Sequence, residues 1–150
     1  MTTDSDAGAR PAARPAALGW RLLALMYDLL PMIPLLMITS AVFLWVNGGK
    51  TVESRPLMAV VEFATMWLLV GAYFVLSWGR GGQTMGMRPW RLRVLAVDGK
   101  PASWRALWLR YAVACFTPVF GMLWTLVDSE RRALYDIAAS TAFVRLQASA

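Results

Sequence analysis

The chain has 150 residues, 58% of them hydrophobic, and a formal net charge of +6. With a mean hydropathy of +0.49 it is more apolar than the core of a water-soluble domain requires, so the composition predicts one membrane-embedded domain. The basic residues gather beside apolar runs, which favours membrane lipids over nucleic acid as the partner of the positive charge.

Residues 1–17 are predicted to be a disordered tail, because they combine small residues, prolines and arginines without an apolar run. The apolar run that follows, Leu18 to Val46, is too long for the core of a signal peptide. As a helix it would measure about 44 Å, which exceeds the roughly 30 Å hydrocarbon core of a bilayer. It is therefore predicted to be the first membrane-spanning helix.

Two charged residues, Arg21 and Asp28, interrupt this apolar run. Charge inside a membrane-spanning helix is costly unless it is paired or hydrated, so both are candidate functional residues. They lie on one face of the helix, about 10 Å apart along the axis, which is too far for a direct salt bridge. Arg21 can reach the interface, whereas Asp28 lies about two turns deeper. Each therefore needs another partner or water.

Two prolines follow Asp28 within two helical turns. Pro31 leaves the carbonyl of Tyr27 without its helical donor, and Pro34 does the same to the carbonyl of Leu30. A carboxylate beside unpaired carbonyls suits a small cation or a proton-carrying water. The alternative is that the prolines only kink the helix and a neighbouring side chain fills the gap.

A second membrane-spanning helix is predicted at residues 57–78, after a break at Asn47–Lys50. Glu62 lies less than two turns from the start of this helix. It is either hydrated at the interface or part of a polar pathway through the membrane.

The polar, arginine-rich segment after the second span contains a partly alternating stretch, Leu92–Val97, that ends at an Asp-Gly turn signal. It predicts a short strand outside the bilayer. Residues Thr141–Arg145 near the C-terminus also have strand character, so the two segments can pair.

The third apolar stretch is residues 105–127, and its continuous apolar part, Tyr111–Val127, is at the short limit for a span and contains Pro118 and Gly121. It either crosses the membrane or enters and returns. A crossing segment would place Arg131 and Arg132 outside, against the positive-inside rule, so a hairpin broken at Pro118 is preferred. The same rule places the N-terminus in the cytoplasm of a multi-pass protein of the cell (inner) membrane.

The expected fold is thus an all-α integral membrane protein. It has two transmembrane helices, at about 18–46 and 57–78, and a broken or re-entrant third apolar segment. A small cytoplasmic strand pair completes one transmembrane domain at residues 18–146.

Three motifs occur in order along the chain. They are an arginine and an aspartate in the first span (Arg21 and Asp28), Gly-Gly-Gln-Thr-Met-Gly at 81–86, and Arg-Arg-Ala-Leu-Tyr-Asp at 131–136. Their order and spacing resemble the RDD family of small bacterial membrane proteins, named for one arginine and two aspartates. The resemblance implies that these three residues are Arg21, Asp28 and Asp136.

The resemblance also assigns a middle motif and an arginine before the last apolar stretch: Gly82, Gln83, Thr84, Gly86, Arg88 and Arg110. The chain departs from the family pattern at Tyr135 and Ile137, where a histidine and an arginine are usual, and at Met87, where lysine is common. The missing histidine weakens a proton-coupled role for Asp136. For activity, the resemblance implies a link to transport, with some members similar to cation/proton antiporters.

The first functional hypothesis is a secondary transporter that exchanges a monovalent cation for protons. Asp28 would alternate between protonated and cation-bound states, since burial raises the pKa of a carboxylate and a cation lowers it. Arg21, Arg110 or Arg88 would balance the charge of empty Asp28. Two or three spans cannot enclose a pathway, so a homo-oligomer is expected.

The second hypothesis is a non-transporting scaffold or accessory subunit, in which the same charges form a structural clamp. In either case Asp136 is expected to return to the Arg21 end of the first helix in a partly desolvated ion pair. An enzyme is not expected, because the chain has no histidine and its one cysteine, Cys115, lies in an apolar stretch. No cofactor or metal is expected.

Overall fold

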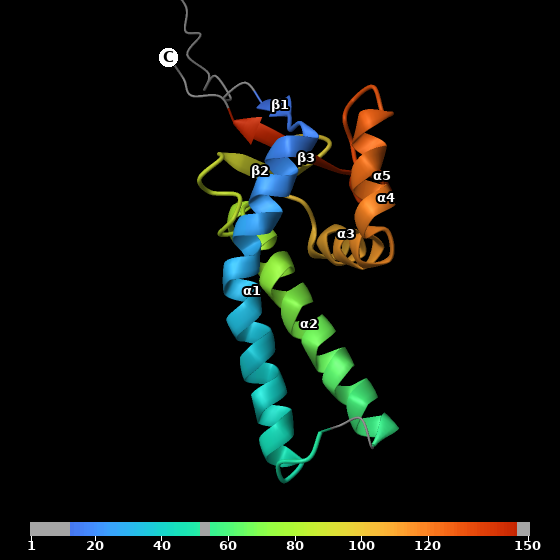
Figure 1. Cartoon of the computed structure of the whole chain (residues 1–150). Coiled ribbons are helices and arrows are strands. Elements are labelled where there is room, and N and C mark those ends of the chain that lie inside the picture. The colour runs from blue at the N-terminus through green and yellow to red at the C-terminus, as the bar shows by residue number, and fades with distance from the viewer. Residues whose placement is uncertain (1–12, 52–54, 147–150) are drawn as a thin grey trace, which may run out of the picture.

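The computed structural model describes residues 13–51 and 55–146 and consists of a long helical pair joined at one end to a small sheet and short helices (Figure 1). The pair is α1 (Leu18–Val46) and α2 (Pro56–Gly81). Both helices are long and apolar enough to cross a membrane, which confirms the two predicted spans. Their connection lies at the end remote from the sheet.

The remaining elements are short: β1 (Ala13–Pro15), β2 (Leu92–Ala96), α3 (Trp104–Phe116), α4 (Pro118–Leu123), the 3-10 turn η2 (Trp124–Leu126), α5 (Leu134–Ala138) and β3 (Thr141–Leu146). The strands form one antiparallel sheet in the order β1-β3-β2. The predicted pairing of the middle loop with the C-terminal segment is confirmed, with Val94 opposite Phe143.

The third strand, β1, corrects the prediction for the N-terminal tail. The composition of residues 1–17 predicts disorder, but Ala13–Pro15 pairs with β3, and the amide of Ala16 donates to the carbonyl of Phe143. Residues 1–12 lie outside the described part. A three-residue strand is too short to show a periodic pattern in the sequence. Its partner strand also lies more than 120 residues away in the chain.

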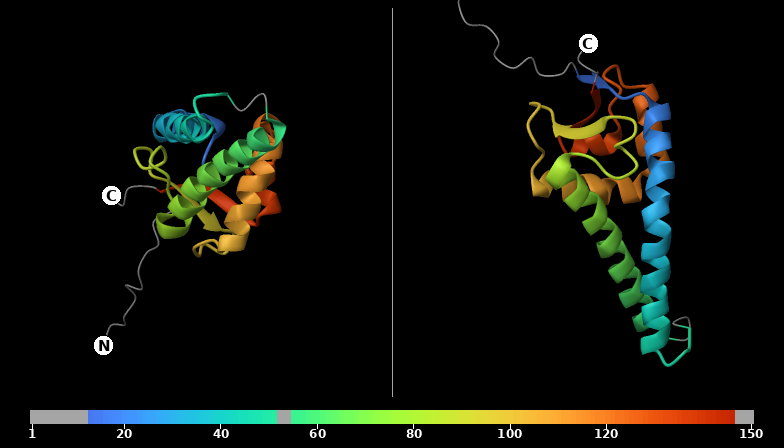
Figure 2. Two further views of the ribbon diagram at one scale, coloured as in Figure 1. Left: turned by 90° about the horizontal axis from the view of Figure 1, so that it is seen from below. Right: turned by 90° about the vertical axis from the view of Figure 1, so that its left-hand side faces the viewer.

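The third apolar segment is broken, as the sequence predicts. Helix α3 and the α4–η2 segment are bent by 112° at Thr117. Pro118 starts α4 as its first residue, where a missing amide hydrogen costs nothing. Figure 2 shows α3 lying across α2 while α4 turns back toward the sheet, so β3 returns to the end where the chain began.

The core lies where the sheet meets α3 and the sheet-side ends of α1 and α2. Val75, Leu92 and Leu107 are buried there, and Gly79 permits close packing because a Cβ would lie 2.4 Å from the indole of Trp104. Away from this junction most of the apolar side chains of the long helices are exposed; Phe63 is 71% exposed. This distribution is that of a protein whose helices face lipid and whose own core is confined to one end.

Candidate functional site: two buried aspartates

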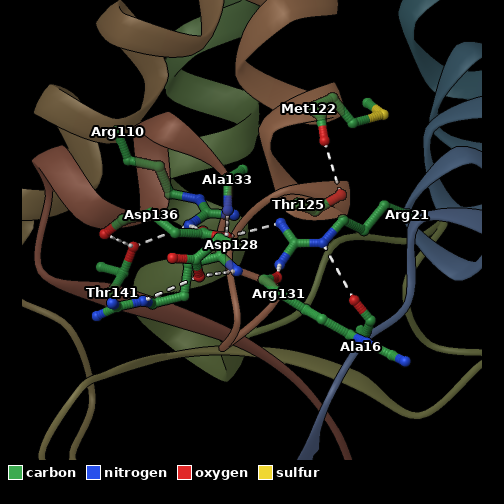
Figure 3. Close-up of polar contacts among 11 residues, drawn as sticks. Ala16, Arg21, Arg110, Met122, Thr125, Asp128, Arg131, Ala133, Asp136 and Thr141 are labelled. Carbon is green, nitrogen blue, oxygen red and sulfur yellow. Dashed lines mark hydrogen bonds and ion pairs between the residues drawn. The ribbon is translucent and has the colours of Figure 1, made fainter.

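Asp136 is the centre of the first charged cluster. The one-turn helix α5 holds its carboxylate inward, where Oδ2 accepts the amide of Ala133 at 3.0 Å and caps the helix. The residue is completely buried. Figure 3 shows two arginines, from α1 and α3, that reach this carboxylate.

Arg21 uses all three of its side-chain nitrogens. Nη1 donates to Oδ2 of Asp136 at 2.7 Å, Nη2 to the carbonyl of Arg131 at 3.1 Å, and Nε to the carbonyl of Ala16 at 3.4 Å (Figure 3). The predicted Arg21–Asp136 contact is confirmed. It is fully buried rather than partly desolvated, because Arg21 is only 4% exposed.

Arg110, on α3, completes the cluster. Its Nη1 donates to Oδ1 of Asp136 and, at 2.8 Å, to Oγ1 of Thr141 on β3. Its guanidinium also lies over the rings of Tyr135 and Trp78, 4.9 and 5.1 Å from their centroids. Within residues 13–51 and 55–146 its buried Nε has no hydrogen-bond partner.

We refer to Arg21, Arg110 and Asp136 as the clamp, because the ion pairs tie α1, α3 and α5 together. Burial alone would raise the pKa of Asp136. The charges of Arg110 and Arg21 and the Ala133 amide outweigh burial, and the pKa of Asp136 lies below its usual value. The clamp carries a formal charge of +1, since two guanidinium groups face one carboxylate.

Asp28 lies apart from the clamp and has a different set of partners. Its Oδ1 accepts the hydroxyl of Tyr73 at 2.8 Å and the amide of Gly86 at 2.9 Å, and its Oδ2 accepts the hydroxyl of Thr84 at 2.6 Å. The residue is 3% exposed. Within the described ranges no arginine or lysine forms an ion pair with it.

The middle motif is the lid over Asp28. Gly82 ends α2 in a left-handed conformation, and Gln83 anchors the loop by donating to the carbonyl of Leu92 at 2.7 Å. At Gly86 the backbone touches α1, because a Cβ would lie 2.1 Å from the carbonyl oxygen of Ala24 and 2.8 Å from the carboxyl carbon of Asp28. Only glycine fits there.

The side chains of the other predicted ion-site residues are not among the hydrogen-bond partners of Asp28. The side chain of Leu30 is 68% exposed, and that of Tyr27 is 47% exposed with its ring against Trp90. Helix α1 continues through both prolines, and the three groups that hydrogen-bond to the Asp28 carboxylate are donors. The role of the Tyr27 and Leu30 carbonyls as ligands stays a prediction. Arg88 is exposed on the loop surface.

Glu62 is buried on α2, but it precedes Tyr73 by 11 residues, about 16 Å along the helix. It therefore belongs to a different depth from Asp28. Tyr73 is the residue that sequence reasoning missed. Asp28 precedes the end of α1 by 18 residues and Tyr73 follows the start of α2 by 17, so equal depth in a helical hairpin was the available signal.

A cavity of about 340 Å³ connects the two aspartate sites. Arg21 and Arg110 line it on the clamp side and Asp28 on the other, while the remaining wall is mainly apolar, from Val70, Phe74, Pro118 and Met122 among others. Among the described residues no three acidic or cysteine side chains come together to hold a metal ion. The lining of the cavity thus combines two arginines and an aspartate with a mainly apolar surface.

Comparison with known proteins places the chain in a family. The family model described as RDD family matches residues 15–140, a range that includes the clamp, Asp28 and the middle motif. Searches of the curated proteins and of the solved structures gave no match. Since the matched range covers most of the 150 residues, this chain belongs to the RDD family.

Proposed function

We propose that this membrane protein exchanges a monovalent cation for protons, with Asp28 as the group that carries them. The observation that supports this most is the environment of Asp28: a buried carboxylate in a membrane-spanning helix that lines a cavity and has no arginine partner among the described residues. A group held by a guanidinium would be locked in its ionised form. Asp28 is not held in this way.

The partners of Asp28 suit a change of state. The hydroxyls of Tyr73 and Thr84 donate to the ionised carboxylate, but a hydroxyl can also accept a hydrogen bond. Rotation of these hydroxyls would let their oxygens accept a hydrogen bond from a neutral Asp28 carboxyl or face a small cation. Hard oxygen ligands of this kind are those that alkali cations prefer.

Charge balance supports one-for-one exchange. With Asp28 ionised, the clamp (+1) and Asp28 (−1) sum to zero across the cavity. A bound proton and a bound monovalent cation each change this sum by the same amount. Binding both at once would leave two uncompensated positive charges in a low-dielectric region, so the two ligands compete.

We propose that the protein works as a homo-oligomer in the cell membrane. Two spanning helices do not enclose a pathway, so several copies would build one in a homo-oligomer. The arginine-rich sheet end would face the cytoplasm of the cell membrane, in accordance with the positive-inside rule.

A non-transporting scaffold or accessory subunit is the second candidate, and one observation favours it. Asp28 accepts three hydrogen bonds and the clamp carboxylate accepts three, so both charges are already satisfied in a static role.

Reconstitution separates the two candidates. Purified protein in liposomes with an internal pH dye is exposed to inward gradients of sodium or potassium. Exchange predicts proton efflux that follows one of these cations and increases with its gradient. No flux above that of empty liposomes, from protein whose thermal unfolding transition is intact, would contradict exchange and leave the scaffold.

A further inference from the structure

A second hollow, of about 660 Å³, lies at the sheet end of the molecule. We call it the arginine hollow, after the four arginines that line it: Arg14, Arg91, Arg131 and Arg145. They come from β1, the loop before β2, the segment before α5, and β3. The indole rings of Trp20 and Trp90 line the same hollow. Two of its lining residues, Ala16 and Arg131, contact the clamp residue Arg21 through their carbonyl oxygens. Asp28 does not line the hollow.

The described part of the chain supplies no counter-charge to this hollow. Arg14 and Arg145 are directly opposite one another in the β1–β3 pair, and like charges at such positions destabilise a sheet. Within residues 13–51 and 55–146 none of the four arginines forms an ion pair, and all four are exposed. An anion in the hollow would offset their repulsion.

The arginines are held by other contacts. The guanidinium of Arg145 stacks 4.0 Å from the ring centroid of Trp20. The carbonyl of Arg91 accepts the amide of Leu146 at 2.9 Å, and that of Arg131 accepts Nη2 of Arg21 at 3.1 Å. Arg91 and Arg131 have φ angles of 54° and 55°, a left-handed conformation that persists in these residues only where surrounding contacts hold it.

The depth of the hollow identifies the anion. Trp20 lies in the first turn of α1, and this helix of about 44 Å is longer than the roughly 30 Å hydrocarbon core. Its first turn therefore projects into the headgroup layer, where tryptophan gathers. The anion most abundant at that depth is the phosphate of a phospholipid. One guanidinium group can donate two parallel hydrogen bonds to the oxygens of a phosphate.

We propose that the arginine hollow binds the phosphate headgroup of an anionic phospholipid. The four arginines contact the phosphate, and stacking on the indole of Trp20 positions the guanidinium of Arg145. The lipid occupies the hollow from the membrane rather than from solution. This site is independent of cation exchange at Asp28, because neither Asp28 nor any of its hydrogen-bond partners lines it.

The test measures lipid binding to the whole chain in a zwitterionic detergent. Phosphatidylglycerol and phosphatidylcholine with the same acyl chains are titrated while the Tm is recorded, and retained lipid is counted by native mass spectrometry. We expect phosphatidylglycerol to raise the Tm and to be retained, and phosphatidylcholine to do neither. The variant Arg14→Gln/Arg145→Gln should bind phosphatidylglycerol at least about tenfold more weakly, since two charge-assisted contacts are lost.

The matched control is Arg93→Gln/Arg105→Gln, which removes the same charge at exposed positions outside the hollow. It should bind phosphatidylglycerol like the wild type. Equal weakening in the two double variants would overturn the proposal in favour of diffuse attraction. Full competition by inorganic phosphate at the same concentration as the lipid would overturn it in favour of a soluble anion.

The single variant Arg14→Gln protects the test against a folding defect. Without lipid its Tm should be equal to or above that of the wild type, because a like-charge pair has been removed. Its Tm increase with phosphatidylglycerol should be smaller than that of the wild type. An undiminished increase would contradict the proposal.

Discussion

At the scale of single residues, the two buried aspartates differ in their partners. Asp136 faces two guanidinium groups, whereas Asp28 faces two hydroxyls and an amide. The two guanidinium groups lower the pKa of Asp136 despite its burial, so they favour its ionised form. Within the described residues no arginine or lysine forms an ion pair with Asp28, and the proposed exchange rests on this difference.

The clamp predicts strong coupling between Arg21 and Asp136. Arg21→Ala should lower the free energy of unfolding by about 3–5 kcal/mol, because it removes one partner of a buried ion pair. Asp136→Ala should cost a similar amount, since it leaves two buried arginines unpaired. The double variant should cost less than the sum by more than about 1 kcal/mol in detergent unfolding experiments. Additive losses would mean that the two residues act independently.

The lowered pKa of Asp136 predicts an acid limit. A group whose pKa is lower in the folded protein than its unfolded value of 3.8 stabilises fully above that pH, and this contribution is lost as pH falls through the folded pKa. The Tm should therefore decrease below about pH 4. In Asp136→Asn the decrease should be smaller, while the exposed control Asp98→Asn should match the wild type. Identical acid profiles for Asp136→Asn and the wild type would contradict this assignment.

At the scale of elements, the middle motif supplies two of the three hydrogen bonds that Asp28 on α1 accepts. The middle motif folds over Asp28 only because Gly86 lets the loop backbone touch α1. This is a contact between segments 58 residues apart. The spacing of Gly82, Gln83, Thr84 and Gly86 identified a motif in the sequence, but not the residue that the motif covers.

Gly86→Ala tests this contact. The added methyl group would lie 2.1 Å from the carbonyl of Ala24, so the loop must move and the hydrogen bonds from Thr84 and Gly86 to Asp28 are lost. We expect a loss of about 1–3 kcal/mol in the free energy of unfolding. Gly81→Ala is the control, because nothing lies within 4 Å of a Cβ there. Equal stability of the two variants would show that the lid does not pack as described.

Some elements could be predicted because their signal is local. Leu18–Val46 is recognisable from apolar length, the break at Pro118 from one residue, and the strand pair from alternation and a turn. The donors of Asp28 and the strand β1 depend on contacts across the chain. Composition is almost silent about such contacts, because Tyr73 looks like any other aromatic residue in an apolar helix.

At the scale of the whole molecule, the sheet joins the two ends of the chain and the middle loop. Strands β1, β2 and β3 come from before α1, after α2 and after the broken segment, and they pair directly. All three segments must then lie on one side of the membrane, with the α1–α2 connection on the other (Figure 1).

Cysteine labelling tests this arrangement. In a Cys115→Ser background, Lys100→Cys and Glu130→Cys should react with an impermeant thiol reagent from the same side of the membrane. Lys50→Cys should react from the opposite side, because Lys50 belongs to the connection between the end of α1 and the start of α2. Reaction of Lys100→Cys and Glu130→Cys from opposite sides would be incompatible with the sheet.

The proposed exchange role of Asp28 is tested most directly by proton flux in liposomes for three proteins: wild type, Asp28→Asn and Glu62→Gln. Asp28→Asn keeps the shape of the side chain but cannot ionise, and Glu62→Gln removes a buried carboxylate at a different depth. We expect cation-driven flux from the wild type and its loss in Asp28→Asn with an intact unfolding transition. Glu62→Gln should retain the flux. Wild-type flux in a folded Asp28→Asn protein would contradict the assignment of Asp28 as the exchanging group.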